Sequence, residues 1–222
     1  MAETRSQKFD VRGYNRIALV CSDMKETTDF YTGVLGFPLV KTIQYPDGSQ
    51  HFFFQATESD SLVFFWSPNP PPSEGAVRIA EIKYDEYGNV LYKVPYRPGP
   101  GAFDHLAFDV PLAKLEEYAE RLRAAGITAT HVNKHLLVVE DGKQTRQVRS
   151  YDEVPPGAKY VDEFVNSVYF LGPDGITLEF AANPRELGNE FDLSNPAMKF
   201  EDGPRILEER RRAEAAAQAS AN

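Results

Sequence analysis

Short apolar runs separated by turn sequences recur along residues 14–66. The first run is followed by Asp23, a favoured helix N-cap residue, and apolar positions at helical spacing then lead to Gly36, a common helix terminator. Pro46-Asp47-Gly48 and Glu58-Ser59-Asp60 separate the later runs, as turn residues do between strands. The pattern predicts a βαβββ unit with a strand at 14–22, a helix at 23–35, and strands at 39–45, 50–56 and 61–66.

The same order of elements recurs from Phe103. An amphipathic helix is predicted at 111–125, ended by Gly126, and it is followed by apolar runs separated by turns. The predicted strands are 103–110, 127–132, 147–151, 166–172 and 176–182. The sequence therefore predicts two similar modules in one chain.

Matching the two units position by position pairs specific residues. FDHLAFDV matches YNRIALVC, and we align EFAANP with FFWSPNP. The predicted pairs are His105 with Arg16, Glu179 with Phe64, and Tyr169 with Phe54.

Two segments and a tail interrupt this repeat. The first segment, residues 68–102, begins with a run of prolines and ends with a Pro-Gly sequence, and it could form a hairpin. The second segment, residues 133–163, is a polar insertion. The predicted organisation is a module at 14–67, a linker at 68–102, a second module at 103–184 with an insertion at 133–163, and a tail at 185–222 with a helix. The predicted fold class is α+β, with two βαβββ modules whose curved sheets pair around one cavity.

Glu179 lies between Leu178 and Phe180 in an apolar strand. A carboxylate in such a strand needs a cation, a metal or solvated space beside it. If the sheets curve towards each other, Glu179 converges with the residues at matching positions, which are Arg16, Phe64 and His105. Imidazole and carboxylate groups are common ligands of iron, manganese or zinc.

Three sequence stretches resemble the vicinal oxygen chelate superfamily. They read NRIALV-x-SDM…FY…VLG, then DHLAFDV, then YF-xx-PDGITLEF. This superfamily includes glyoxalase I, bleomycin and fosfomycin resistance proteins, and extradiol ring-cleaving dioxygenases. The resemblance covers most of residues 14–66 and 103–183 and specifies the fold better than the reaction.

The resemblance implies metal ligands at the first and last strands of each module. His105 and Glu179 match two of these positions, and the apolar Phe64 matches members with three protein ligands. Arg16 replaces the usual histidine, and a guanidinium cannot bind a metal. Two alternatives remain open: Arg16 pairs with Glu179 in place of a metal, or His51 completes a metal site.

Several aromatic side chains are predicted around the same cavity. Tyr169 lies ten residues before Glu179, a spacing that resembles the active-site tyrosine of extradiol dioxygenases, and it is alternatively an ordinary strand residue. The residues expected to contact a flat substrate are Phe52, Phe54, Phe64 and Trp66, which could equally be core residues.

Composition narrows the partners and the compartment. A net charge of −9 over 222 residues argues against a nucleic-acid or anionic membrane partner. The single cysteine, Cys21, fits a reducing compartment, and the N-terminus lacks the apolar core of a signal peptide. We expect a cytoplasmic protein that acts on a small molecule, and a homodimer is left open.

The resemblance implies a metal-dependent enzyme of the superfamily, an extradiol-dioxygenase-like oxidoreductase acting on an aromatic or oxygen-chelating substrate. His105 and Glu179 would hold the metal, and Tyr169 and Arg16 would take part in catalysis. One alternative is a glyoxalase or lyase. The other is a metal-free, resistance-type binding protein in which Arg16 replaces the metal.

Overall fold

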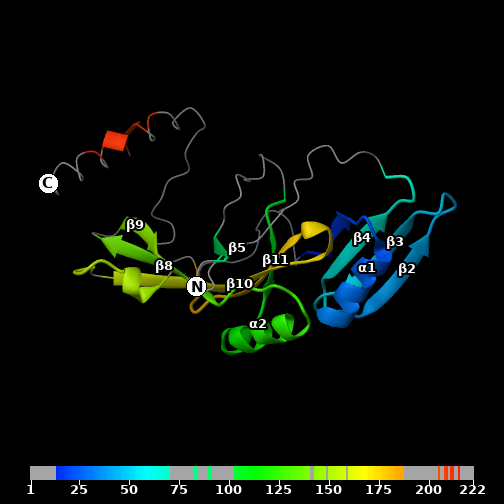
Figure 1. Ribbon diagram of the computed structural model, residues 1–222, viewed down its shortest axis with the longest axis horizontal. Helices are drawn as coiled ribbons and strands as arrows, with labels where there is room; N and C mark the ends of the chain where they lie inside the picture. Colours follow the sequence, from blue (N-terminus) through cyan, green and yellow to red (C-terminus); the bar gives the residue numbers. More distant parts are fainter. Residues whose placement is uncertain are drawn as a thin grey trace, which may run out of the picture.

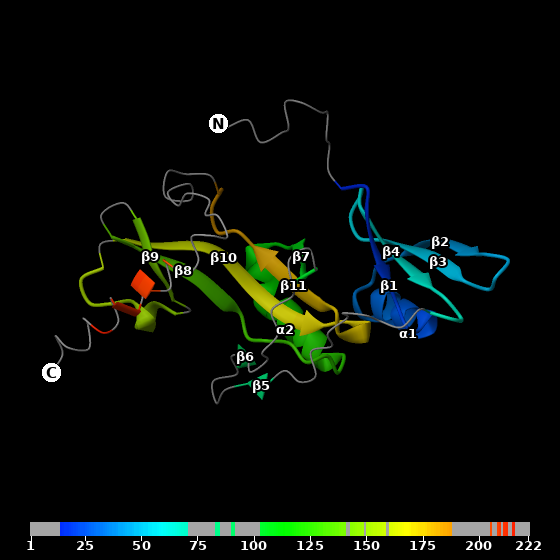
Figure 2. The same cartoon turned by 90° about the horizontal axis from the view of Figure 1, so that it is seen from above.

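Two β-sheets lie side by side along the long axis of the molecule, each with a helix on one face (Figure 1). The computed structural model describes residues 14–70, 83–84, 90–91, 103–140, 143–148, 150–158 and 160–187, with single residues between 205 and 215. The view from above shows the same arrangement (Figure 2). The predicted α+β class with paired sheets is confirmed.

The first sheet has four strands in the order β1-β4-β3-β2. β1 and β4 are parallel and the other pairs antiparallel, as a βαβββ unit requires. Asp23 caps the helix by accepting a hydrogen bond of 2.9 Å from the Glu26 amide, and Gly36 follows it with φ 72°. The elements are β1 (Arg16–Val20), α1 (Met24–Asp29), a π-helical turn (Phe30–Val34), β2 (Leu39–Gln44), β3 (Gln50–Gln55) and β4 (Ser61–Trp66).

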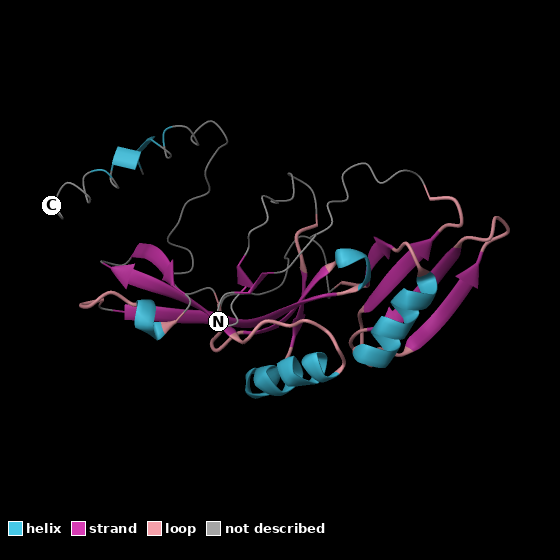
Figure 3. Ribbon diagram, in the orientation of Figure 1, coloured by secondary structure: helices cyan, strands magenta, loops and turns pink. Residues whose placement is uncertain are grey.

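The second sheet has five strands in the order β7-β11-β10-β8-β9. Helix α2 packs against β10 and β11, and Figure 3 shows it on one face of this sheet. The main elements are β7 (Leu106–Asp109), α2 (Leu115–Ala124), β8 (Asn133–Glu140), β9 (Lys143–Val148), β10 (Tyr160–Leu171) and β11 (Thr177–Ala182). Short 3₁₀ turns lie at Leu112–Lys114, Tyr151–Glu153 and Pro173–Gly175.

The second module differs from the expected strand positions. Residues 127–132 make an isolated bridge between Ala129 and Phe170 rather than a strand. The Thr130 hydroxyl accepts the Tyr169 N–H at 3.0 Å, so a side chain takes the place of a ladder carbonyl. The insertion at 133–163 contains β8, β9 and the start of β10, because its Leu and Val residues form a small apolar cluster of their own.

The linker and tail are described only in part. The predicted linker hairpin is present as β5 (Lys83–Tyr84) paired antiparallel with β6 (Val90–Leu91). The described tail residues Arg205, Glu208, Glu209, Arg211, Arg212 and Ala215 are helical; the rest of the predicted tail helix lies outside the described residues. No helix in the described parts is both long and apolar enough to cross a membrane.

The first sheet presents a different face to its helix than the sequence suggested. Phe54 and Phe64 are fully buried, with ring centroids 5.6 Å and 4.8 Å from that of Tyr31. Phe52 and Trp66 pack against the same core cluster. These four aromatic residues therefore lie on the face of the sheet that packs against the helical segment. The expectation that they line the cavity is wrong, because the helical segment needs an apolar surface to pack against.

The register of the repeat also needs a correction of one residue. Ala18 pairs with Val63 in the first module, and the matching Ala107 pairs with Glu179 in the second. Val63, rather than Phe64, is thus the counterpart of Glu179. The alignment of EFAANP with FFWSPNP allows for one extra residue in the first module, whereas two residues lie between β4 and Asn69 and none between β11 and Asn183. By the same register, Phe53 is the counterpart of Tyr169.

Contacts between the modules involve the turn before β11. The backbone N–H of Ser22 donates to the Asp174 carboxylate at 2.9 Å, and its hydroxyl also donates to that carboxylate. Gly172 lies so close to Leu178 and Tyr31 that an added Cβ would meet Leu178 at 3.1 Å. One continuous apolar core therefore spans both modules.

Candidate functional site

His105 and Glu179 meet on the second sheet. His105 directly precedes β7, and Glu179 lies on β11, which pairs with β7 in parallel. The His105 Nε2 atom is 3.0 Å from Glu179 Oε2. The Glu179 side chain is 5% exposed and the His105 side chain 37%, so the pair lies at the boundary between interior and solvent.

Two neighbouring residues orient this pair. The Nδ1 atom of His105 lies 2.6 Å from an oxygen of Asp104, and the Ser167 hydroxyl donates to Glu179 Oε1. His105 Nδ1 and Glu179 Oε1, the outer polar atoms of the pair, therefore each have a hydrogen-bonding partner. The inner atoms, His105 Nε2 and Glu179 Oε2, face each other. Carboxylate and hydroxyl partners of this kind fix the orientation of metal-ligating side chains.

The facing atoms form a place for a cation. A neutral imidazole carries one N–H, so it can donate to Asp104 or to Glu179 but not to both. If it donates to Asp104, Nε2 and Oε2 are two acceptors 3.0 Å apart. Such a contact is favourable when a second proton or a metal ion lies between the atoms.

Tyr169 lies beside the pair. It is opposite Glu179 in the β10–β11 ladder, and its ring centroid is 5.9 Å from that of His105 in an edge-on arrangement. His135, on β8, lies on the other side of Tyr169 at 6.4 Å between centroids. The sequence thus placed Tyr169 correctly next to the predicted ligands.

Arg16 does not join this group. Its Nη1 atom donates to Asn15 Oδ1 at 2.8 Å, and no ion pair within 4.0 Å is found between Arg16 and Glu179, both of which are described. Glu179 is instead contacted by His105 and Ser167. The alternative in which Arg16 pairs with Glu179 in place of a metal does not match this geometry.

His51 occupies the open face of the first sheet. It is 8% exposed and stacks on Phe65, with ring centroids 3.7 Å apart, and Phe53 flanks it at 4.4 Å. Burial lowers the pKa of His51, and the nearby charge of Arg16 lowers it further. His51 forms no metal-binding group with His105 and Glu179 among the described residues, so the alternative in which it completes a metal site does not match this geometry.

A metal ion would find two protein ligands here. Ligand bonds of about 2.1 Å at a right angle place the two donor atoms about 3 Å apart, which agrees with the 3.0 Å between Nε2 and Oε2. The described residues offer no group of three or more His, Cys, Asp or Glu that could hold a metal. The pair therefore fits two adjacent positions of a divalent ion and leaves the others open.

A pocket lies elsewhere in the described part of the chain. It has a volume of about 670 Å³, and among the predicted site residues only Arg16 contributes to its wall. The sequence reasoning also missed Asp104 and Ser167, which orient the pair. Asp104 could have been found from its position directly before His105, whereas Ser167 depends on the strand register.

The chain is an α+β protein whose two sheets each contain a parallel pair of strands, β1 with β4 and β7 with β11, and the second pair carries the facing His105 and Glu179 side chains. The sequence profile of the Glyoxalase/Bleomycin resistance protein/Dioxygenase superfamily matches residues 13–180. The chain belongs to this superfamily, which confirms the resemblance seen in the sequence.

Known relatives agree with this assignment. The chain is 30% identical over 151 residues to the "Putative ring-cleaving dioxygenase MhqO" of Bacillus subtilis (strain 168), a match that covers 65% of this chain and 45% of that protein. The chain thus spans less than half the length of this relative.

The solved structures to which the chain is similar include a glyoxalase family protein from Enterococcus faecalis, at 20% identity and a TM-score of 0.47, covering 77% of this chain and 97% of that one. They also include the fosfomycin resistance protein FosX from Listeria monocytogenes complexed with Mn(II) and sulfate, at 16% identity and a TM-score of 0.42, covering 78% of this chain and 93% of that one.

Proposed function

We propose that this protein is a metal-dependent, dioxygenase-like enzyme acting on a small aromatic substrate with two adjacent oxygens. The observation that carries the proposal is the His105–Glu179 pair, whose inner atoms face each other at 3.0 Å while their outer atoms are held by Asp104 and Ser167. The similarity to a relative named for ring cleavage supports the same reaction class.

His105 and Glu179 would hold a divalent iron or manganese ion. When bound, such an ion acts as a Lewis acid on the substrate oxygens. Because the pair supplies two ligands, adjacent positions remain for the two oxygens of a chelating substrate. Zinc would fit the same donor atoms.

The protein's own residues would position and deprotonate the substrate. Asp104 holds the imidazole of His105 with Nε2 directed at Glu179, and Ser167 fixes the carboxylate rotamer. The Tyr169 hydroxyl is proposed to accept or deliver a substrate proton, since its ring packs edge-on against His105. Arg16 takes no part in this arrangement.

The alternatives differ in what supports them. A metal-free, resistance-type binding protein is favoured by one observation, the lack of a third ligand among the described residues. A proton between Nε2 and Oε2 would then replace the metal. A glyoxalase-type reaction is less consistent with the structure, because Val63 takes the place where glyoxalase I typically has an acidic residue.

Metal analysis of the purified protein tests the proposal. After reconstitution with Fe(II), Mn(II) or Zn(II) and desalting, we expect about one ion per chain, lost in His105→Ala and in Glu179→Ala. His131→Ala, which changes an exposed histidine, serves as the matched control. Equal metal content in the wild type and both ligand variants would overturn the assignment of His105 and Glu179 as metal ligands. A wild-type protein that binds no metal after reconstitution would overturn it as well.

Oxygen uptake with catechols then tests the reaction. We expect the Fe(II)-loaded wild type to consume oxygen and Tyr169→Phe to lower kcat by about 100-fold or more, the usual contribution of a proton-transfer residue. Metal content should not change in Tyr169→Phe. Unchanged kcat would remove Tyr169 from the proposed chemistry and leave the metal assignment intact.

A further inference from the structure

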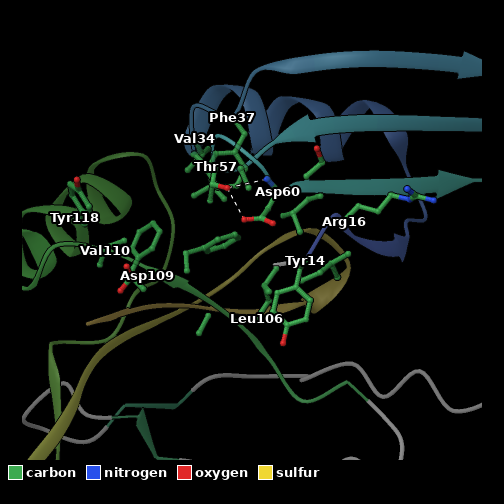
Figure 4. Close-up of a pocket in the computed structure, with 18 of the residues that line it drawn as sticks. Tyr14, Arg16, Val34, Phe37, Thr57, Asp60, Leu106, Asp109, Val110 and Tyr118 are labelled. Atoms are coloured by element: carbon green, nitrogen blue, oxygen red, sulfur yellow. Dashed lines mark hydrogen bonds between the residues drawn. The ribbon is translucent and has the colours of Figure 1, made fainter. Parts of the chain in front are cut away.

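The pocket of about 670 Å³ lies between the open edges of the two sheets (Figure 4). Among the described strands, β1 pairs with β4 alone and β7 with β11 alone, so both are edge strands. Residues of both strands line the pocket, and helix α2 and the turn before β4 supply further walls. Its volume lies within the range of about 300–1,000 Å³ that is typical of small-molecule sites.

Aromatic side chains from both modules form much of the wall. Phe37 from the first module contacts Phe108 from the second, with centroids 5.3 Å apart. Phe180 lies 5.7 Å from Tyr118 and 6.3 Å from Phe108. Neither His105 nor Glu179 lines the pocket. The pocket therefore suits an apolar or aromatic body and is separate from the candidate metal site.

A carboxylate is built into this apolar wall. Oδ2 of Asp60 accepts hydrogen bonds from the hydroxyls of Thr57 at 2.8 Å and Ser59 at 3.1 Å. Oδ1 is shielded from solvent and accepts no hydrogen bond from the described part of the chain. Figure 4 shows the Asp60 side chain between Val110 and Tyr118 on one side and Tyr14 on the other. A carboxylate in such surroundings favours a cation nearby.

The other charged side chains leave Asp60 without an ion pair. The lining holds two carboxylates, Asp60 and Asp109, and two guanidinium groups, Arg16 and Arg121. Arg121 pairs with Glu117, which Lys114 also contacts, and Arg16 donates to Asn15 and extends away from the centre of the pocket. Among the described residues neither guanidinium group forms an ion pair with Asp60, so the Asp60 carboxylate is the group that favours a positively charged ligand.

We propose that this pocket is a second ligand site, which binds a small monocation with an aromatic or apolar body. The aromatic walls would enclose the body, and the charged group would lie towards Asp60. The site goes beyond the proposed metal-dependent function, and it can be tested with or without metal.

Isothermal titration calorimetry with three probes tests the proposal. The probes, 4-phenylbutylamine, 4-phenylbutanol and 4-phenylbutyrate, share a phenyl group on a short alkyl chain and end in a cation, a neutral hydroxyl and an anion respectively. We expect the amine to bind at least about tenfold more tightly than the other two, since a charge-assisted contact contributes about 1.5 kcal/mol or more. Asp60→Asn should remove this preference while leaving alcohol binding unchanged. Ala56→Leu, which fills the pocket, should weaken all three probes.

Two controls separate this site from its surroundings. Glu58→Gln removes a charge from the same turn at an exposed position outside the pocket and should change nothing. His105→Ala should leave amine binding intact even where it abolishes metal binding. Equal affinity for the three probes, an amine preference that survives Asp60→Asn, or no binding at millimolar concentration would each overturn the proposal.

Discussion

Alanine substitution of two adjacent phenylalanines on β4 tests the register of the first module. Phe64 is 1% exposed, and its ring lies 4.8 Å from that of Tyr31 and 5.9 Å from that of Phe54. Phe65 is 38% exposed on the opposite face and stacks on His51. The same chemical change at neighbouring positions should therefore have very different costs.

The expected magnitudes follow from burial. Phe64→Ala should lower the free energy of unfolding by about 3–5 kcal/mol, because it removes buried apolar surface and leaves a cavity. Phe65→Ala should cost about 1–2 kcal/mol, because much of that ring already contacts water and no enclosed cavity forms. Since whole domains are stable by about 5–15 kcal/mol, the first loss is a large fraction of the total.

Urea denaturation of both variants, followed by circular dichroism, measures the difference. A lower midpoint for Phe64→Ala than for Phe65→Ala, with similar m-values, is the expected result. If the two variants lose equal stability, or if Phe65→Ala is the less stable, the assignment of faces on β4 is wrong, and with it the position of Val63 opposite Glu179 in the repeat.

Three further predictions concern single side chains. Cys21 is 4% exposed and burial raises the pKa of its thiol, so a thiol reagent at pH 8 should label it slowly in the native protein and rapidly in urea; equal rates would contradict the buried position. Because the pKa of His51 is lowered in the folded state, the unfolded chain binds more protons near its usual pKa of about 6.5, and stability should fall as pH drops from about 7 to 5. His51→Gln should reduce this fall in urea titrations at the two pH values, and an identical pH dependence would refute the assignment. Asp174 has φ 60° and accepts two hydrogen bonds from Ser22, so Asp174→Ala should cost about 1–3 kcal/mol by thermal unfolding and Asp174→Asn less; no loss in the Ala variant would show that this link contributes little.

The order of elements was predictable from the sequence because local signals determine it. Asp23 and Gly36 mark the ends of the first helical segment, and the turn at Pro173–Gly175 joins the last two strands as expected. The internal repeat and the family motifs pointed to His105 and Glu179 as neighbours, which the structure bears out at 3.0 Å.

The faces of the first sheet were harder to predict. β3 and β4 carry apolar residues at consecutive positions, so alternation alone does not show which side contacts the helix. The error of one residue moved Phe54 and Phe64 to the wrong face. Tertiary packing against Tyr31 decides the face, and no local pattern encodes it.

The position of Arg16 depended on how the modules sit relative to each other. The repeat correctly identified Arg16 as the counterpart of His105. Convergence of the two residues required the sheets to close around one site, whereas they lie side by side. The arrangement of modules depends on contacts between distant segments, such as Ser22 with Asp174, which the sequence does not reveal.

The most direct test of the central claim is the Mn(II) affinity of four proteins, measured by electron paramagnetic resonance titration: the wild type, His105→Ala, Glu179→Ala and the double variant. We predict that each single variant binds Mn(II) at least about tenfold more weakly than the wild type and that the double variant binds little more weakly than either single variant. A fifth protein, Arg16→His, serves as a control and should match the wild type. Equal affinities in all four proteins would contradict the claim that His105 and Glu179 form one metal-binding unit.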